Sequence, residues 1–209
     1  MAATAQATKN QITLKGSVAT VTEFFQHALS SILYQRGIYG PESFEPKKAY
    51  GLTVMAVKDD KLTAYLQAVL QQFSKWLEGG ALQKVVLVVT SVTSKEVLER
   101  WTFDIQTDKA VVSGSAPLPE KSESQITSEI QAIIRQITAS VTFLPLLQDT
   151  STIDLLAYTD KENEVPLDWE ESDPRYITNA ADVKLRAFST KVHNVEALVS
   201  YKADEDDMM

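Results

Sequence analysis

The chain has 209 residues, of which 44% are hydrophobic and 23% are charged, so it is long enough to bury the core of one globular domain. Its net charge of -8 opposes binding to nucleic acid or to an anionic membrane, and no apolar run approaches the roughly 18 residues of a transmembrane helix. The absence of cysteine excludes disulfides, thiolate metal sites and cysteine nucleophiles, and we expect a soluble intracellular protein.

The N-terminal part predicts a weak strand followed by a long helix. Ile12 and Leu14 flank Thr13 in the alternation of a short strand, and Ser17 has the character of a helix N-cap. Apolar residues then recur at helical spacing as far as Gly37. The predicted buried stripe consists of Val18, Val21, Phe24, Phe25, Ala28, Leu29, Ile32 and Leu33.

A hairpin and a second helix are predicted next. Residues 44–57 are rich in aromatic and β-branched residues around Gly51, which indicates a short hairpin. Asp59 and Asp60 are typical of a helix start, and the glycines at 79 and 80 are typical of a helix end. The predicted stripe of this helix is Leu62, Tyr65, Leu66, Val69, Phe73, Trp76 and Leu77.

The middle of the chain predicts two paired strands, a connection, a third helix and another strand. Residues 85–89 are continuously apolar, whereas 100–105 alternate, as expected for an antiparallel pair. The polar stretch 106–125 indicates an exposed connection. A helix is predicted from about Ser124 to Pro145, with a core stripe of Ile126, Ile130, Ile133, Ile134, Ile137 and Val141. Residues 151–158 then alternate as a strand, with Ile153, Leu155 and Ala157 on one face.

The C-terminal third predicts two strands at the end of a long tether. Residues 160–179 contain two prolines and an acidic cluster, which indicates an irregular surface segment. Alternating runs follow at 183–187 and 198–201. We predict an α+β fold with three helices on one face of an antiparallel sheet, and terminal strands that use a sheet edge and can move.

Patterns of enzyme chemistry are largely missing. The seven glycines form neither a dinucleotide fingerprint nor a P-loop, and the two histidines lack metal-ligand spacing. Asp149-Thr150-Ser151 lacks the glycine of an aspartic-protease loop, and the acidic cluster Asp168, Glu170, Glu171 and Asp173 lacks calcium-loop spacing. We therefore predict no catalytic residue, no metal and no cofactor, and an enzyme built on the Asp149 or Asp168 cluster is the competing hypothesis.

Several stretches resemble the HORMA-domain family, and specifically its spindle-checkpoint members. They are SILYQRGIY at 31–39, VLERWTFDI at 97–105, IRQITA at 134–139, VTFLPLL at 141–147, YTDK at 158–161 and WEES at 169–172. The resemblance implies a HORMA domain over 12–202, with a mobile C-terminal safety belt at 158–202. A flexible arm at 1–11 and an acidic tail at 203–209 flank it.

The resemblance also implies a non-enzymatic open/closed switch that traps a partner peptide under the belt. The peptide would add as a strand beside residues 151–158, and the belt strands would dock on the sheet edge in place of the piece at 12–14. Implied peptide-binding residues are Ile153, Leu155, Ala157, Tyr158, Trp76 and Trp169; implied belt docking residues are Val183, Leu185, Val195, Leu198 and Tyr201. The implied N-terminal switch consists of Ile12 and Leu14. The implied interface for a second copy or an adaptor consists of Arg135, Gln136 and Phe143.

The partners that the resemblance implies are proteins. They are a coiled-coil kinetochore receptor, the activator of the anaphase-promoting complex, a silencing adaptor, a HORMA-remodelling ATPase and a second copy in an open-closed dimer. The expected locations are the nucleus, the kinetochore and the cytoplasm. The alternative is a constitutive HORMA structural adaptor subunit, for example of a translesion polymerase or a meiotic axis.

Overall fold

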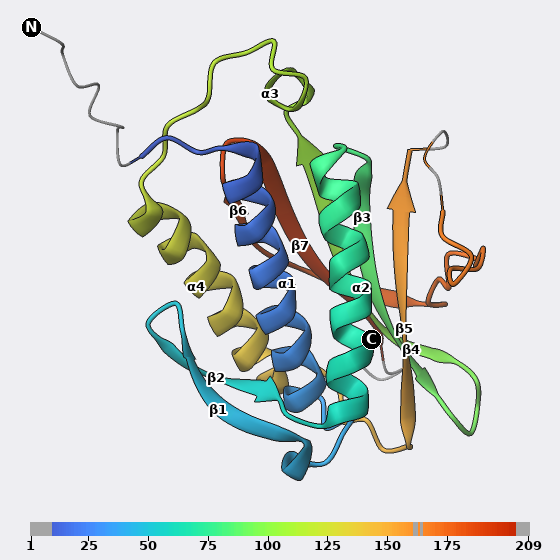
Figure 1. The fold of residues 1–209 in the computed structure, drawn as a ribbon. Coiled ribbons are helices and arrows are strands. Elements are labelled where there is room, and N and C mark those ends of the chain that lie inside the picture. Colours follow the sequence, from blue (N-terminus) through green and yellow to red (C-terminus); the bar gives the residue numbers. More distant parts are fainter. Residues whose placement is uncertain (1–9, 161–162, 164, 204–209) are drawn as a thin grey trace, which may run out of the picture.

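A computed structural model describes residues 10–160, 163 and 165–203, and these build helices over one face of an antiparallel sheet (Figure 1). The helices on the sheet are α1 (Leu14–Gln35), α2 (Asp60–Glu78) and α4 (Glu123–Ala139). The five sheet strands lie in the order β5 (Ser151–Thr159), β3 (Leu82–Ser91), β4 (Val97–Thr107), β7 (His193–Lys202) and β6 (Ala180–Ser189). The predicted α+β architecture is confirmed. Within the described ranges, no helix is long and apolar enough to span a membrane.

Helix α1 lies between α2 and α4 and starts earlier than predicted. The Thr13 side chain accepts a hydrogen bond from the Gly16 N–H at 3.0 Å, so Thr13 is the N-cap and Leu14 is already helical. The predicted strand at residues 12–14 and the predicted cap at Ser17 are therefore wrong for this arrangement. Ile12 instead donates its N–H to the Pro119 carbonyl at 2.9 Å, beside an isolated bridge from Gln11 to Glu120.

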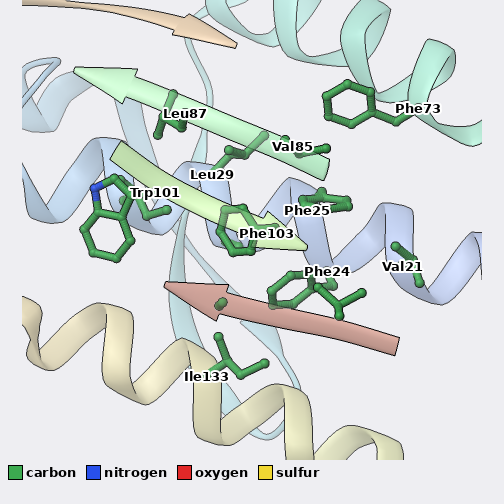
Figure 2. Close-up of a cluster of buried hydrophobic side chains, with 14 of the residues drawn as sticks. Val21, Phe24, Phe25, Leu29, Phe73, Val85, Leu87, Trp101, Phe103 and Ile133 are labelled. Carbon is green, nitrogen blue, oxygen red and sulfur yellow. The ribbon is translucent and has the colours of Figure 1, made fainter. Parts of the chain in front are cut away.

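The core lies between α1 and the inner faces of β3 and β4, as Figure 2 shows. Phe24 and Phe25 reach the ring of Phe103 with centroids 5.8 and 5.4 Å apart, both in edge-to-face geometry. All three rings are buried, and each stabilises the fold by about 1.5–3 kcal/mol through removal of apolar area from water. The predicted α1 stripe is confirmed, since all its residues are buried.

The predicted hairpin is present as β1 (Phe44–Ala49) and β2 (Leu52–Val57), which follow a short 3-10 turn at Pro41–Ser43. Tyr50 and Gly51 both have positive φ at the turn, which suits the right-handed twist of a tight hairpin. Asp59 caps α2 by accepting from the Leu62 N–H at 2.9 Å, and Gly79 is its C-cap, as predicted.

Two local predictions are wrong, and the mostly exposed connection contains one element that was not predicted. Tyr65 of α2 is 42% exposed and does not belong to the buried stripe. Val141 is 44% exposed because α4 ends at Ala139 and a 3-10 turn, Ser140–Thr142, replaces the helical period. The connection at 106–125 contains a short helix, α3 (Lys109–Val112), which buries Val111.

The C-terminal hairpin, β6 with β7, docks on the free edge of β4, as the edge prediction required. Its tip is anchored by His193, which is fully buried. The Ser17 hydroxyl lies 2.7 Å from the imidazole Nδ1, and the imidazole Nε2 lies 3.3 Å from the Leu77 carbonyl. Since a carbonyl only accepts, Nε2 carries a proton, and in the neutral imidazole Nδ1 then accepts from the Ser17 hydroxyl.

Stability should therefore fall in mild acid. Burial lowers the pKa of His193 below its ordinary 6.5, although the Leu77 carbonyl acts the other way; burial also lowers the pKa of His27. The unfolded chain binds the proton more readily, so the free energy of unfolding is highest above pH 6.5. Below that pH it falls by up to about 1.4 kcal/mol per pH unit for each histidine. Urea titrations at pH 7.5, 6 and 5 measure the slope. His193→Gln should reduce it, and an unchanged slope would contradict this account.

Candidate functional site

The two edges of the five-stranded sheet differ. Strand β6 at one edge lies against α4. Strand β5 at the other edge pairs only with β3, and no described strand lies beside its outer side. The outer row of backbone N–H and C=O groups on β5 thus faces no other described strand and can pair with another chain, although Leu155 already makes a backbone hydrogen bond to Tyr65 of α2.

A long irregular segment passes around this open edge. Residues 160, 163 and 165–179, called the crossing segment here, lie between the end of β5 and the start of β6 at the far side of the sheet (Figure 1). Two contacts fix the path. On the helix side, the Trp169 ring packs edge-to-face on Trp76 of α2 at 5.0 Å. On the helix-free side, Arg100 of β4 lies 4.9 Å from the ring of Tyr176. The chain between Trp169 and Tyr176 therefore crosses from one face of the sheet to the other around β5.

The space between β5, α2 and the crossing segment is an open channel. Two adjoining cavities of about 530 and 800 Å³ share Leu155, Leu156 and Trp169 in their walls. We call this space the edge channel. Its floor presents an apolar strand and its roof is an irregular segment, a geometry that accommodates an extended peptide by strand addition.

The roof of the edge channel is acidic. The side chains of Asp168, Glu170, Glu171 and Asp173 line it, all in exposed residues. Arg175 lies 3.3 Å from Asp154 of β5 and 3.8 Å from Asp173, which ties the crossing segment to the strand. These pairs are partly exposed, so each contributes at most about 1 kcal/mol. The field in the channel favours a partner segment that carries basic side chains.

Sequence reasoning missed three channel residues. Tyr65 lines the wider cavity beside β5, and burial first, then the Asp154 charge, raises its pKa. Asp154 and Arg175 carried no signal in the sequence, because their pairing joins β5 to a segment without regular structure. The role of Tyr65, an exposed aromatic residue on the apolar stripe of α2, could be recognised only once the open edge of β5 beside it was known.

The predicted peptide-binding residues lie on β5 and beside it, but they do not all share one face. Leu155 is buried, and Ile153 and Ala157 are half-buried, on the face that packs against the core. Tyr158 points to the opposite face, where the Lys84 ammonium lies 5.8 Å from its ring. All four lie on β5, and Trp76 and Trp169 flank them.

The other predicted residues fall on two more surfaces. The residues assigned to belt docking lie on β6 and β7, where Leu185 and Val195 are buried and Val183, Leu198 and Tyr201 are half-buried. Arg135 and Phe143 are exposed at the end of α4 and the turn after it. Gln136 is half-buried, and its side-chain oxygen accepts a hydrogen bond from the Arg186 N–H at 2.6 Å. The flexible arm and the acidic tail fall largely outside the described residues.

The competing enzyme hypothesis gains no support from the geometry. Asp149 lies in the loop before β5 and accepts from the Ser91 hydroxyl at 3.1 Å, an ordinary turn contact. Asp168, Glu170 and Glu171 are exposed, and the exposed Asp173 pairs with Arg175. In the part of the chain that the structure describes, no group of three metal-ligating side chains could hold an ion.

Comparison with known proteins agrees with this geometry. The HORMA domain family model matches residues 17–193. The mitotic spindle assembly checkpoint protein MAD2A of Dictyostelium discoideum is 54% identical over 202 residues, covering 97% of this chain and 98% of the relative. MAD2A of Homo sapiens is 50% identical over 196 residues, covering 94% and 95%. A solved chain from the mitotic checkpoint complex is 41% identical with a TM-score of 0.83, over 90% of this chain and 99% of that one.

The chain belongs to the HORMA domain family. Its function is that of a mitotic spindle checkpoint protein, because its relatives from amoeba, plant, animal and yeast match it over nearly their full length and carry that name. The alternative of a constitutive structural adaptor is not favoured. A Caenorhabditis elegans HTP-2 structure, only 16% identical with a TM-score of 0.71, shares the fold. The relatives are checkpoint signalling proteins.

Proposed function

We propose that this chain traps an extended segment of a partner protein as an added strand on β5, with the belt (158–202) closed around it. The observation that carries the proposal is the unpaired outer edge of β5 inside the edge channel. Backbone hydrogen bonds to β5 supply affinity, and the apolar wall around Leu155 and Trp169 selects side chains. HTP-2, a fold relative, is described as bound to a closure motif, which suits the same mode.

The arrangement described here corresponds to the closed state of the proposed switch. In the open state the C-terminal hairpin leaves β4, Leu14 unwinds from the start of α1, and Ile12 and Leu14 pair with β4 as a strand. Each backbone hydrogen bond contributes a net free energy of about 0.5–1.5 kcal/mol. Because the switch exchanges one strand's hydrogen bonds for another strand's, the open and closed states differ little in free energy. A partner segment that contacts only the closed state therefore shifts the population.

The proposed partner in the channel is the activator of the anaphase-promoting complex, whose capture inhibits that complex. A coiled-coil kinetochore receptor holds a second closed copy by the same channel. The face with the exposed Arg135 and Phe143 and the half-buried Gln136 serves an open-closed self-dimer and a silencing adaptor. A remodelling ATPase reopens the closed form. The proposed sites of action are the nucleus, the kinetochore and the cytoplasm, and the proposed domain spans 12–202.

Strand addition has a sharp test in N-methylated peptides. A peptide from the anaphase-promoting-complex activator is N-methylated at alternate residues, in two sets shifted by one position. Because strand N–H groups alternate in direction, the set that faces β5 should abolish binding by calorimetry, whereas the other set should still bind. Amide NMR spectra of the chain, recorded without and then with the unmodified peptide, should also show slow-exchange shifts in β5 and the crossing segment. Equal binding by both sets, or no shifts, would contradict the proposal.

A further inference from the structure

The β6 edge of the sheet is covered by a set of side chains that complement its backbone. Arg186 lies within a bulge of the β6–β7 register, between Lys184 and Ala187, and Ser189 lies beyond this bulge. Gln136 accepts from the Arg186 N–H at 2.6 Å, and Glu129 accepts from the Ser189 N–H at 3.0 Å. Both acceptors come from α4, so a helix takes the place that another strand would occupy.

The spacing of the two acceptors matches the spacing of the two donors. Glu129 and Gln136 are seven residues apart, which is two helical turns and about 10.5 Å along α4. Arg186 and Ser189 are three residues apart, which is about 10 Å along an extended strand. The match holds for this alignment of β6 on α4, and sliding the strand by one residue would remove both hydrogen bonds.

Lys121, just before α4, closes this set of contacts. Its ammonium lies 2.7 Å from both Glu129 carboxylate oxygens and donates to the Ser189 carbonyl, also at 2.7 Å. The Lys121 side chain is only 9% exposed. Ser189 thus has its N–H bound by Glu129 and its C=O bound by Lys121, and charge-assisted bonds of this kind are stronger than neutral ones.

We infer that Lys121, Glu129 and Gln136 are positioning residues that latch the C-terminal hairpin in its docked alignment and so set how fast a trapped segment is released. The inference rests on the proposed function, because the crossing segment can move away from β5 only after the hairpin behind it detaches. None of the three residues lines the edge channel, so they act on release through the hairpin alone.

A matched pair of glutamines tests the latch. Gln136→Ala removes the acceptor, whereas Gln125→Ala truncates an exposed glutamine of the same helix and is the control. Gln136→Glu keeps an acceptor and should restore the wild-type result. All variants carry Arg135→Ala, so that self-pairing does not enter. Release of a fluorescein-labelled activator peptide should be about fivefold faster for Gln136→Ala, from the loss of one hydrogen bond. Amide hydrogen exchange at Arg186 should also accelerate in the peptide-free chain.

The outcomes separate the latch from the proposed function. If Gln136→Ala and Gln125→Ala release peptide equally fast, the latch is wrong even though capture stands. If the wild-type chain captures no peptide, the proposed function fails, and hydrogen exchange at Arg186 and Ser189 still decides whether the contacts hold β6. Lys121→Met supplies an independent variant. Faster exchange at Ser189 with unchanged release would overturn the kinetic role.

Discussion

Replacing Glu99 by alanine should destabilise the fold by about 3–5 kcal/mol, because it leaves the Arg36 guanidinium buried without its counter-charge. Arg36 and Glu99 are 3% and 2% exposed, and their charged atoms lie 2.6 Å apart. Glu99 also accepts from the Trp101 indole N–H at 3.0 Å, and Arg36 donates to the Pro145 carbonyl. The pair thus joins the end of α1 to β4 and to the loop before β5, so its loss affects the whole domain.

Urea unfolding followed by circular dichroism measures this loss. The control is Asp104→Ala, which breaks an exposed pair with Lys84 at 3.1 Å and should cost less than about 1 kcal/mol. The double variant Arg36→Met with Glu99→Leu replaces both charges by apolar groups and should lose less than Glu99→Ala alone. Similar losses of unfolding free energy for Glu99→Ala and Asp104→Ala would show that the buried pair stabilises the fold no more than the exposed pair does.

Trp169→Ala should weaken peptide capture by about 30-fold or more, the effect of losing a central aromatic anchor worth about 2 kcal/mol. Trp169 holds the crossing segment on the helix side of β5. Its ring centroid lies 5.0 Å from that of Trp76 and 6.1 Å from that of Phe73. Without it, the roof of the edge channel loses its aromatic contacts with α2, while the partly exposed contacts of Arg175 and Tyr176 remain. The loss should appear mainly as faster release.

Dissociation of a labelled activator peptide, followed by fluorescence anisotropy, measures this effect. The control is Arg135→Ala, which should change self-pairing and not peptide capture. Arg135 is exposed on α4 away from the channel, so this variant should keep peptide capture and lose self-pairing in analytical ultracentrifugation. Retained capture in Trp169→Ala, or lost capture in Arg135→Ala, would show that the two surfaces are assigned wrongly.

The sequence was a good guide wherever the signal is local. The apolar period of α1, the carboxylates before α2 and the turn at Gly51 each depend on neighbours within a few residues, and each prediction is confirmed. The errors are also local in origin. Thr13 and Ser17 are both suitable caps, and only the hydrogen bond from Gly16 decides between them. Ser17 instead bonds to His193, a residue that is distant in the chain.

The class of fold, most of the strands and the absence of common catalytic motifs were determined by the sequence alone, because periodicity and motif spacing are properties of the chain itself. The tertiary structure decided which sheet edge receives the C-terminal hairpin, which edge stays open and which side chains surround it. Those features depend on backbone pairing between distant residues, such as Thr102 with Leu198, for which no local pattern codes. Asp154, Arg175 and the Glu129–Lys121 contacts acquire a role only once those strands lie in place.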